Sequence, residues 1–264
     1  MRRKMEINRL MSAFLRVRCL PTDAVLLWIA VASTSFAQNG APTFRPPSVP
    51  SAAVGTAPAG SPPSAPTNYE PGDLYLPGSR VYVLVDKTGF GHQHGVIGQI
   101  KQGRIRLDVP QDSGQLVLDL ATFAADPDLA RQYVGLTGTE DASSQQQVTA
   151  NMLSADVLDV AHYPTATLQI KLIAPLPNVS QRGFPQYQLD GDFTLHGVTQ
   201  PIHVIADAEQ NGAWTHLRGG FSILQTQYRI TPFTKALGAV GVADQLQIYG
   251  DLWLSKDRQT VPPK

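Results

Sequence analysis

The feature that most constrains this chain is an alternation of apolar and polar side chains that recurs through residues 74–255. Side chains at positions i, i+2 and i+4 of a β-strand share one face, so each alternating segment predicts a strand with an apolar face and a wetter face. The apolar positions are Val81, Val83 and Val85; Ile105, Leu107 and Val109; Leu116, Leu118 and Leu120; Leu168, Ile170 and Leu172; Ile202, Val204 and Ala206; and Leu246, Ile248, Gly250, Leu252 and Leu254.

Turn-forming pairs separate these predicted strands, among them Gln102-Gly103, His196-Gly197 and Asn211-Gly212. Asn-Gly is the strongest short hairpin signal, because both central positions of a type I′ turn need a positive φ. Connections this short join antiparallel neighbours. The sequence therefore predicts a mainly β, antiparallel sheet of about eight strands.

One region interrupts the strands with helical signals. Asp126-Pro127-Asp128 is typical of a helix start, and Ser143 with Gln146 forms a capping-box pattern. Val148, Met152 and Leu153 then fall on one helical face. We expect one inserted helical excursion in the sheet.

A flat sheet of this size would leave two open edges, and closure into a barrel removes them. An eight-stranded barrel is just wide enough to be filled by side chains or to hold one small ligand. We therefore predict an antiparallel eight-stranded barrel. A two-layer sandwich is the alternative that the pattern leaves open.

The chain outside the barrel has its own signals. A basic leader, an apolar run at 24–32 and small residues ending at Ala37 predict a signal peptide over 1–37, with an uncleaved anchor as the alternative. Residues 38–72 hold nine of the 21 prolines and predict a disordered linker. We assign the barrel domain to 73–256 and a disordered tail to 257–264, and we expect a periplasmic or secreted protein.

Composition excludes several classes of protein. The 264 residues carry a formal net charge of zero and only 16% charged side chains, which argues against a nucleic-acid partner because such proteins carry a clustered basic surface. The single cysteine, Cys19, excludes an intrachain disulfide and a Cys-His zinc finger. After cleavage no membrane-spanning segment is expected.

Three stretches resemble the YceI-like family. The most specific is 190–202, DGDFTLHGVTQPI, in which a strand, a Gly-Val-Thr turn and a Pro-led strand follow one another. The segment 152–167, with an Asp-rich corner and Tyr163-Pro164, resembles a second family motif, and Gly98 with 103–105 resembles the early hairpin. The resemblance implies a lipocalin-like barrel, exported to the periplasm, that holds a polyisoprenoid or similar lipid chain without catalysis. The Gly- and His-rich segment 88–95 departs from the usual start of the family.

Burial of hydrocarbon provides the physical case for such a ligand. Each buried CH₂ contributes about 0.8 kcal/mol, so a few isoprene units would exceed an association cost of roughly 4–15 kcal/mol. No catalytic residue, metal site or cofactor is predicted, and a homodimer is left open. The candidate ligand-binding residues are Phe90, His92, His94, Phe123, Leu153, Leu168, Ile170, Phe193, Phe221 and Ile223.

Two alternatives remain for these residues. His92 and His94, two apart, would share one face of a strand and could converge on an ion, which would indicate a metal-dependent enzyme. That site lacks a third ligand with diagnostic spacing, and we instead expect the two histidines to lie at the barrel mouth and to bind a lipid headgroup. A barrel with a solid interior would indicate a structural envelope protein.

Overall fold

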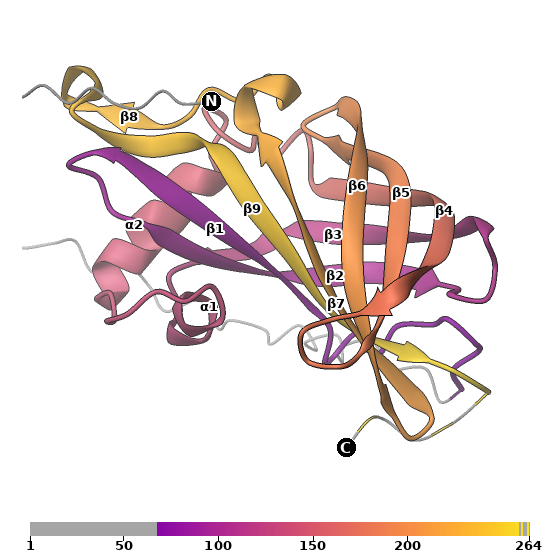
Figure 1. Cartoon of the computed structure of the whole chain (residues 1–264). Coiled ribbons are helices and arrows are strands. Elements are labelled where there is room, and N and C mark those ends of the chain that lie inside the picture. The colour runs from indigo at the N-terminus through magenta and orange to yellow at the C-terminus, as the bar shows by residue number, and fades with distance from the viewer. Residues whose placement is uncertain (1–67, 259, 261–262, 264) are drawn as a thin grey trace, which may run out of the picture. The chain divides into compact units, whose positions relative to one another are not determined.

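Eight long antiparallel strands close into a barrel in the computed structural model, which describes residues 68–258, 260 and 263 (Figure 1). The sheet order is β1-β2-β3-β4-β5-β6-β7-β9-β8, and β1 also pairs with β9, which closes the ring. The strands are β1 (Arg80–Gly89), β2 (His94–Ile105), β3 (Gln111–Ala125), β4 (Thr165–Val179), β5 (Pro185–Leu195), β6 (Val198–Asn211), β7 (Trp214–Leu224), β8 (Thr234–Lys235) and β9 (Val240–Ser255).

The closed barrel confirms the predicted fold class. A ninth strand appears because the two residues of β8 pair with the start of β9, outside the ring of long strands. The predicted signal peptide and the linker up to residue 67 lie outside the described residues, as do 259, 261–262 and 264 in the predicted tail. Residues 68–72 are described, and Tyr69 among them is buried.

The helical excursion lies between β3 and β4 and consists of α1 (Asp128–Tyr133) and α2 (Ala142–Leu153). Both starts differ from the expected ones. Pro127 is the N-cap of α1 without a side-chain cap, since the Asp126 carboxylate is used in a buried cluster described below. Asp141, not Ser143, caps α2 by accepting hydrogen bonds from two backbone N–H groups. Two short 3-10 turns, η1 (Gln225–Tyr228) and η2 (Ala236–Gly238), follow β7.

The alternation of apolar and polar residues predicts most of the inward-facing side chains. Where the observed burial differs from this prediction, the difference has a local cause. A bulge between Ile170 and Leu172 shifts the register of β4, so Ile173 is buried in place of the exposed Leu172. Tyr82, expected on the wetter face, is buried because Tyr133 of α1 stacks on its ring at 3.7 Å. The segment 106–109 is a turn rather than a continuation of β2.

The turns follow the glycine signals closely. His196 and Gly197, between β5 and β6, both have positive φ, as a type I′ turn requires. Between β6 and β7 the two-residue loop is Gly212-Ala213, one residue later than expected, and Gly212 takes the positive φ.

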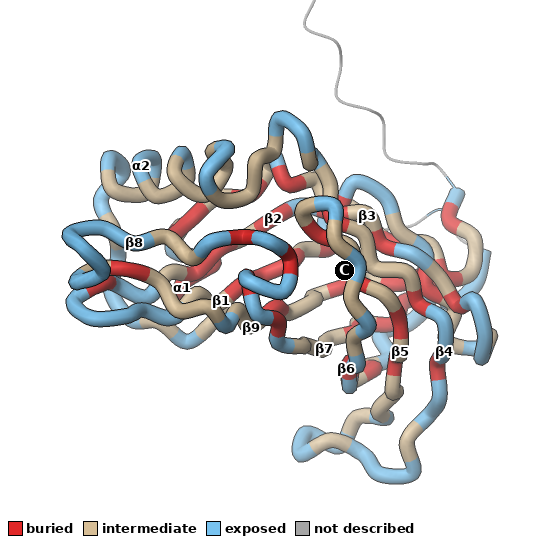
Figure 2. The backbone as a smooth tube through the Cα atoms, turned by 90° about the horizontal axis from the view of Figure 1, so that it is seen from above, coloured by how far each residue is buried: buried red, intermediate tan, exposed pale blue. Residues whose placement is uncertain are grey.

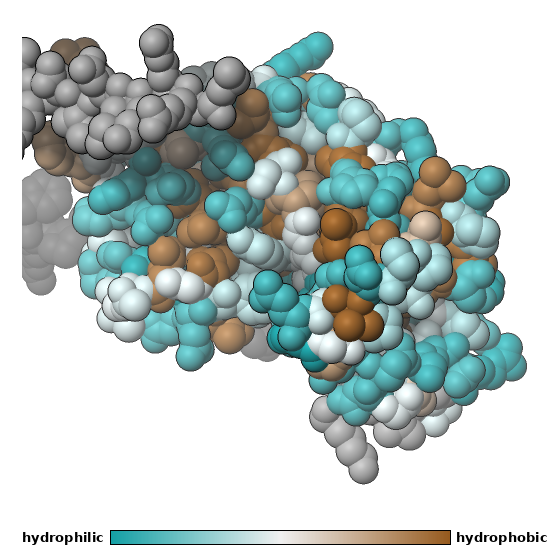
Figure 3. Space-filling view, in the orientation of Figure 1, coloured by the Kyte–Doolittle hydropathy of each residue, from teal (hydrophilic) through white to brown (hydrophobic). Residues whose placement is uncertain are grey.

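Buried residues, red in Figure 2, recur along the strands of the ring, and most of them form one hydrophobic core cluster. On the face drawn in Figure 3, apolar side chains are interspersed with polar ones. This arrangement matches a barrel that buries its apolar faces inward.

The two ends of the barrel are built differently. At one end, which we call the aromatic end, Tyr69, Tyr75 and Trp214 pack edge-to-face with centroid distances of 5.0 to 6.2 Å. Segment 72–75 is tied there by backbone hydrogen bonds to β2 and β9. At the other, which we call the helical end, lie the β1–β2 turn, the excursion between β3 and β4, η1, β8 and η2 (Figure 1).

Candidate functional site

A cavity of about 160 Å³ lies inside the barrel towards the helical end. Strands supply most of its wall. α2 and the turn after it add Val148, Asn151, Met152, Val157 and Leu158, and the segment after β7 adds Gln225 and Phe233. The backbone N–H of Ala125 donates to Thr149 Oγ1 at 3.0 Å, which fixes α2 against the end of β3. The strand residues in the wall are Val81, Val83, Val85, His94, Val96, Leu118, Leu120, Phe123, Ala125, Ala166, Phe193, Leu195, Val242, Leu246 and Ile248.

A second cavity of about 60 Å³ lies deeper in the barrel. Four residues line both cavities: Val81, Leu118, Phe193 and Ile248. Phe193 packs edge-to-face against Phe221 at 5.3 Å and against Tyr228 at 5.9 Å. These four residues therefore lie between the two cavities, and we call them the constriction. The Phe193 ring is its largest member.

Polar side chains reach only the larger cavity. His94, Asn151 and Gln225 contribute to its wall, whereas the wall of the smaller cavity contains no polar side chain. The Gln225 amide nitrogen donates to Ala243 O at 2.8 Å, and Asn151 Oδ1 accepts from Gln147 at 3.0 Å. The interior is therefore apolar along its length, with its few polar groups at the helical end.

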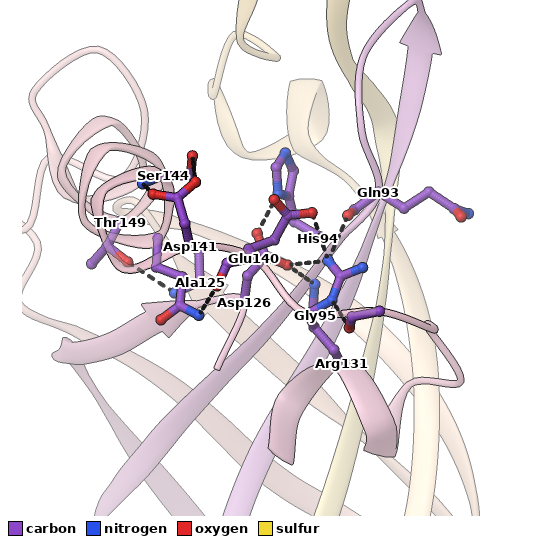
Figure 4. A network of polar contacts seen from close by, with 12 residues as sticks. Gln93, His94, Gly95, Ala125, Asp126, Arg131, Glu140, Asp141, Ser144 and Thr149 are labelled. Atoms are coloured by element: carbon purple, nitrogen blue, oxygen red, sulfur yellow. Dashed lines mark hydrogen bonds and ion pairs between the residues drawn. The ribbon is translucent and has the colours of Figure 1, made fainter. Parts of the chain in front are cut away.

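His94 belongs to a buried ionic cluster (Figure 4). Its Nδ1 lies 2.6 Å from Asp126 Oδ2, and the side chains of His94 and Asp126 are 17% and 1% exposed. Asp126 Oδ1 accepts from the Gly95 backbone N–H and from an Arg131 guanidinium nitrogen, both at 3.0 Å. Arg131 also donates to the Thr137 and Gly138 carbonyls and lies 3.5 Å from Glu140 Oε1.

The contacts of Asp126 determine its ionisation. Burial alone raises the pKa of the Asp126 carboxyl, but hydrogen bonds from His94, Gly95 and Arg131 outweigh burial and hold that pKa below its usual range. An ionised carboxylate accepts hydrogen bonds and cannot donate them, so His94 Nδ1 carries a proton. Nε2, on the opposite side of the ring, is thereby left as the atom of His94 that can serve a ligand in the cavity.

Six of the ten predicted residues line a cavity. His94 and Phe123 line the larger one, Leu168, Ile170 and Phe221 line the smaller one, and Phe193 lines both. Leu153 and Ile223 line neither: Leu153 packs at the edge of the core, and Ile223 is buried within it. Phe90 and His92 are exposed at the helical end and also line neither cavity.

The predicted geometry of the histidine pair is wrong. β2 begins at His94, and residues 91–93 form the turn before it, so His92 and His94 do not share a strand face. Within residues 68–258, 260 and 263, no three His, Cys, Asp or Glu side chains are grouped closely enough to hold a metal ion.

Sequence reasoning missed two groups of wall residues. Val83 and Leu120 were detectable from the alternation, which marks both as inward-facing. Val157 and Leu158, in the turn after α2, carry no such signal, because they approach the cavity only when the excursion folds over the end of the ring.

The closed antiparallel ring and its apolar cavity define a lipocalin-like barrel. Residues 77–253 match the family described as YceI-like domain, and the chain belongs to that family. The resemblance found in the sequence is thus confirmed.

The chain is similar to several bacterial proteins. A UPF0312 protein of Azotobacter vinelandii is 30% identical over 100 residues, 37% of this chain and 49% of that protein. A UPF0312 protein of Pseudomonas syringae pv. tomato is 33% identical over 101 residues, which are 38% of this chain and 50% of that protein. The chain thus spans about half the length of the curated relatives it matches.

The chain is also similar to solved structures at low sequence identity. BcnA of Burkholderia cenocepacia is 22% identical with a TM-score of 0.49, over 69% of this chain and 100% of the other. A polyisoprenoid binding domain from Saccharophagus degradans is 13% identical with a TM-score of 0.44, and the match covers 70% of this chain and 97% of that domain. In the described part of this chain no helix has the length and apolar character needed to cross a membrane.

Proposed function

We propose that the barrel binds the hydrocarbon chain of an isoprenoid or similar amphiphilic lipid in its interior and carries it without chemical change. The observation that carries the proposal is the larger cavity, whose wall is apolar except for three polar side chains. A hydrocarbon chain is the ligand class that gains most from such a wall, since apolar burial contributes about 25 cal/mol per Å².

The cavity volumes limit what the barrel holds without rearrangement. The larger one, about 160 Å³, is close to the roughly 150 Å³ of an engineered apolar cavity that takes up benzene. It accommodates a short length of chain as it stands. A longer chain has to pass the constriction, which requires the Phe193 ring to rotate away from Phe221.

The position of His94 gives the ligand an orientation. With its Nδ1–H donating to Asp126, His94 keeps Nε2 as its second hydrogen-bonding atom. A hydroxyl headgroup at the helical end would hydrogen-bond to Nε2, and the hydrocarbon would extend towards the aromatic end. The predicted signal peptide supports the further proposal that the protein works in the cell envelope.

Native mass spectrometry of gently purified protein tests the function. We expect a bound lipid in the wild type and its loss in Ala166→Leu, which fills the larger cavity from a buried position on β4. Ala174→Leu, on an exposed position of the same strand, is the matched control and should retain the lipid. A stoichiometric metal without lipid, or equal lipid in all three proteins, would overturn the proposal.

A further inference from the structure

The two most exposed large apolar side chains in the described part of the chain are Phe90, at 85%, and Leu237, at 109%. They lie on neighbouring loops at the helical end. The Phe90 backbone N–H donates to Ala239 O at 2.9 Å, and Gly89 pairs with Val240. Two projecting apolar side chains therefore share one small area. We call segments 88–91 and 235–239 the rim loops.

The backbone around Leu237 is in an unfavourable conformation. Ala236, Leu237 and Gly238 have φ values of 50°, 56° and 87°, all in the left-handed region. That region is uncommon for a residue with a bulky side chain, and such strain concentrates at functional sites. The Leu237 side chain is fully exposed to water and its backbone is in a region that leucine disfavours, so neither feature stabilises the isolated chain. This combination points to a contact that Leu237 makes with another molecule.

The rim loops adjoin the larger cavity. Phe233 and Val242, on either side of segment 235–239, both belong to the cavity wall. Lys87 is exposed three residues before Phe90 and Lys235 is exposed two residues before Leu237, and Asp86 is a nearby acid that accepts from Gln93. Apolar side chains flanked by cations are the combination that anchors proteins in the interface of an anionic membrane.

We propose that the rim loops insert Phe90 and Leu237 into a lipid bilayer surface, which places the helical end against the membrane for loading and release of the ligand. This inference rests on the proposed lipid carriage. Residues before the barrel are a less suitable occupant, because the described chain begins at the aromatic end, with Tyr69 packed on Trp214. A second copy of the chain is distinguished by the experiment below.

Position-specific fluorescence tests insertion. Cys19 is the sole cysteine, so Cys19→Ser provides a background for single NBD labels at Phe90→Cys, Leu237→Cys and, as control, the exposed Val179→Cys at the other end of β4. The full chain is mixed with vesicles of phosphatidylethanolamine and phosphatidylglycerol. Labels at specific positions are needed because the apolar run at 24–32 could by itself bring the chain to vesicles.

We expect the NBD emission at 90 and 237 to shift to the blue with vesicles and the emission at 179 to stay unchanged. Equal responses at all three positions, or none at 90 and 237, would overturn the proposal. A blue shift at 90 and 237 that appears without vesicles and grows with protein concentration would assign the rim loops to a second copy instead, and would also overturn it.

Transfer kinetics separate this inference from the proposed function. The double variant Phe90→Ser with Leu237→Ser should bind geranylgeraniol with wild-type affinity but deliver it to vesicles at least about tenfold more slowly, because the variant loses apolar contact with the membrane and not with the ligand. Unchanged transfer by the double variant would refute membrane docking. Absence of geranylgeraniol binding in the wild type would refute lipid carriage, while the NBD result would still report on docking.

Discussion

The aromatic end and the helical end of the barrel close the same ring by different means. The aromatic end uses three large rings, Tyr69, Tyr75 and Trp214, packed edge-to-face beside a segment tied to β2 and β9. The helical end uses two helices and several loops, and it contains the larger cavity and a buried ionic cluster.

We expect the two ends to have different roles, the aromatic end in the stability of the fold and the helical end in ligand binding. Edge-to-face packing of large rings stabilises the fold and offers a ligand little space. Helices and loops fill the other end incompletely, since the excursion meets the strands through a few side chains such as Val148 and Met152. We expect changes at the aromatic end to affect unfolding, and changes at the helical end to affect the ligand.

The largest expected effect is on stability, from Trp214→Ala at the aromatic end. Trp214 is 3% exposed, and removing a buried aromatic side chain typically costs about 3–5 kcal/mol. Denaturant unfolding should show that loss with ligand affinity nearly unchanged. Phe233→Ala, which truncates a half-buried ring at the helical end, should instead lower ligand affinity with a smaller loss of stability. The reverse pattern would break the comparison.

Asp126→Asn tests a place where we expect the helical end to contribute strongly to stability. Leaving Arg131 without its carboxylate partner in a buried site should cost about 3 kcal/mol. Chemical denaturation at neutral pH measures the loss. A loss below about 1 kcal/mol would show that Glu140 and the loop carbonyls suffice for Arg131.

The same carboxylate gives a pH signature. Because the pKa of Asp126 is lowered in the folded protein, the unfolded chain takes up the proton first as pH falls. The stabilisation is fully present above the ordinary carboxyl pKa of about 3.9 and is lost as pH falls from there through the lowered folded value. Asp126→Asn should remove this part of the acid slope of the unfolding free energy. An unchanged slope would contradict the assignment. The other titratable or charged side chains of the cluster are His94, Arg131 and Glu140.

Phe193→Leu sharpens the comparison at the boundary between the two ends. A smaller side chain at the constriction should join the two cavities and cost about 1–2 kcal/mol of stability, because buried atoms are removed. Titrations should show that the affinity for geranylgeraniol rises relative to the affinity for geraniol. An equal change for both alcohols would mean that the constriction does not limit chain length.

The smallest expected effect on ligand affinity comes from His94→Phe. Loss of one hydrogen bond to a hydroxyl headgroup corresponds to about 0.5–1.5 kcal/mol, or up to about tenfold in affinity. The preference for geranylgeraniol over the hydrocarbon without the hydroxyl should disappear. His92→Phe, the same substitution at an exposed position, should leave the preference intact. A loss of preference in both variants would place the headgroup elsewhere.

The barrel itself could be predicted from the sequence, because period-two alternation reports which side of each strand is buried. Leu118 and Ile248 follow the pattern and line both cavities. Leu172 does not, because a bulge in β4 depends on pairing with β5. Local periodicity contains no information on such a register shift.

The polar part of the site was less predictable. Asp126 was expected at the start of a helix, yet its φ of 61° turns the chain so that its carboxylate reaches His94 and Arg131. His92 and His94 were expected on one strand face, and the start of β2 separates them. The contacts of Asp126 and the separation of His92 from His94 depend on how the excursion and the β1–β2 turn fold towards each other. The spacing of residues along the chain contains no information on that.

The most direct test of the central claim is to locate the ligand by intermolecular NOEs between geranylgeraniol and isotope-labelled methyl groups of the protein. We predict NOEs from the prenyl methyls to Leu118, Leu120 and Ile248 inside the barrel, and none to the exposed Leu172 and Ile205. NOEs confined to Leu172, Ile205 or other outward-facing methyls would show that the lipid binds the outer surface, and would contradict the assignment of the cavity as the binding site.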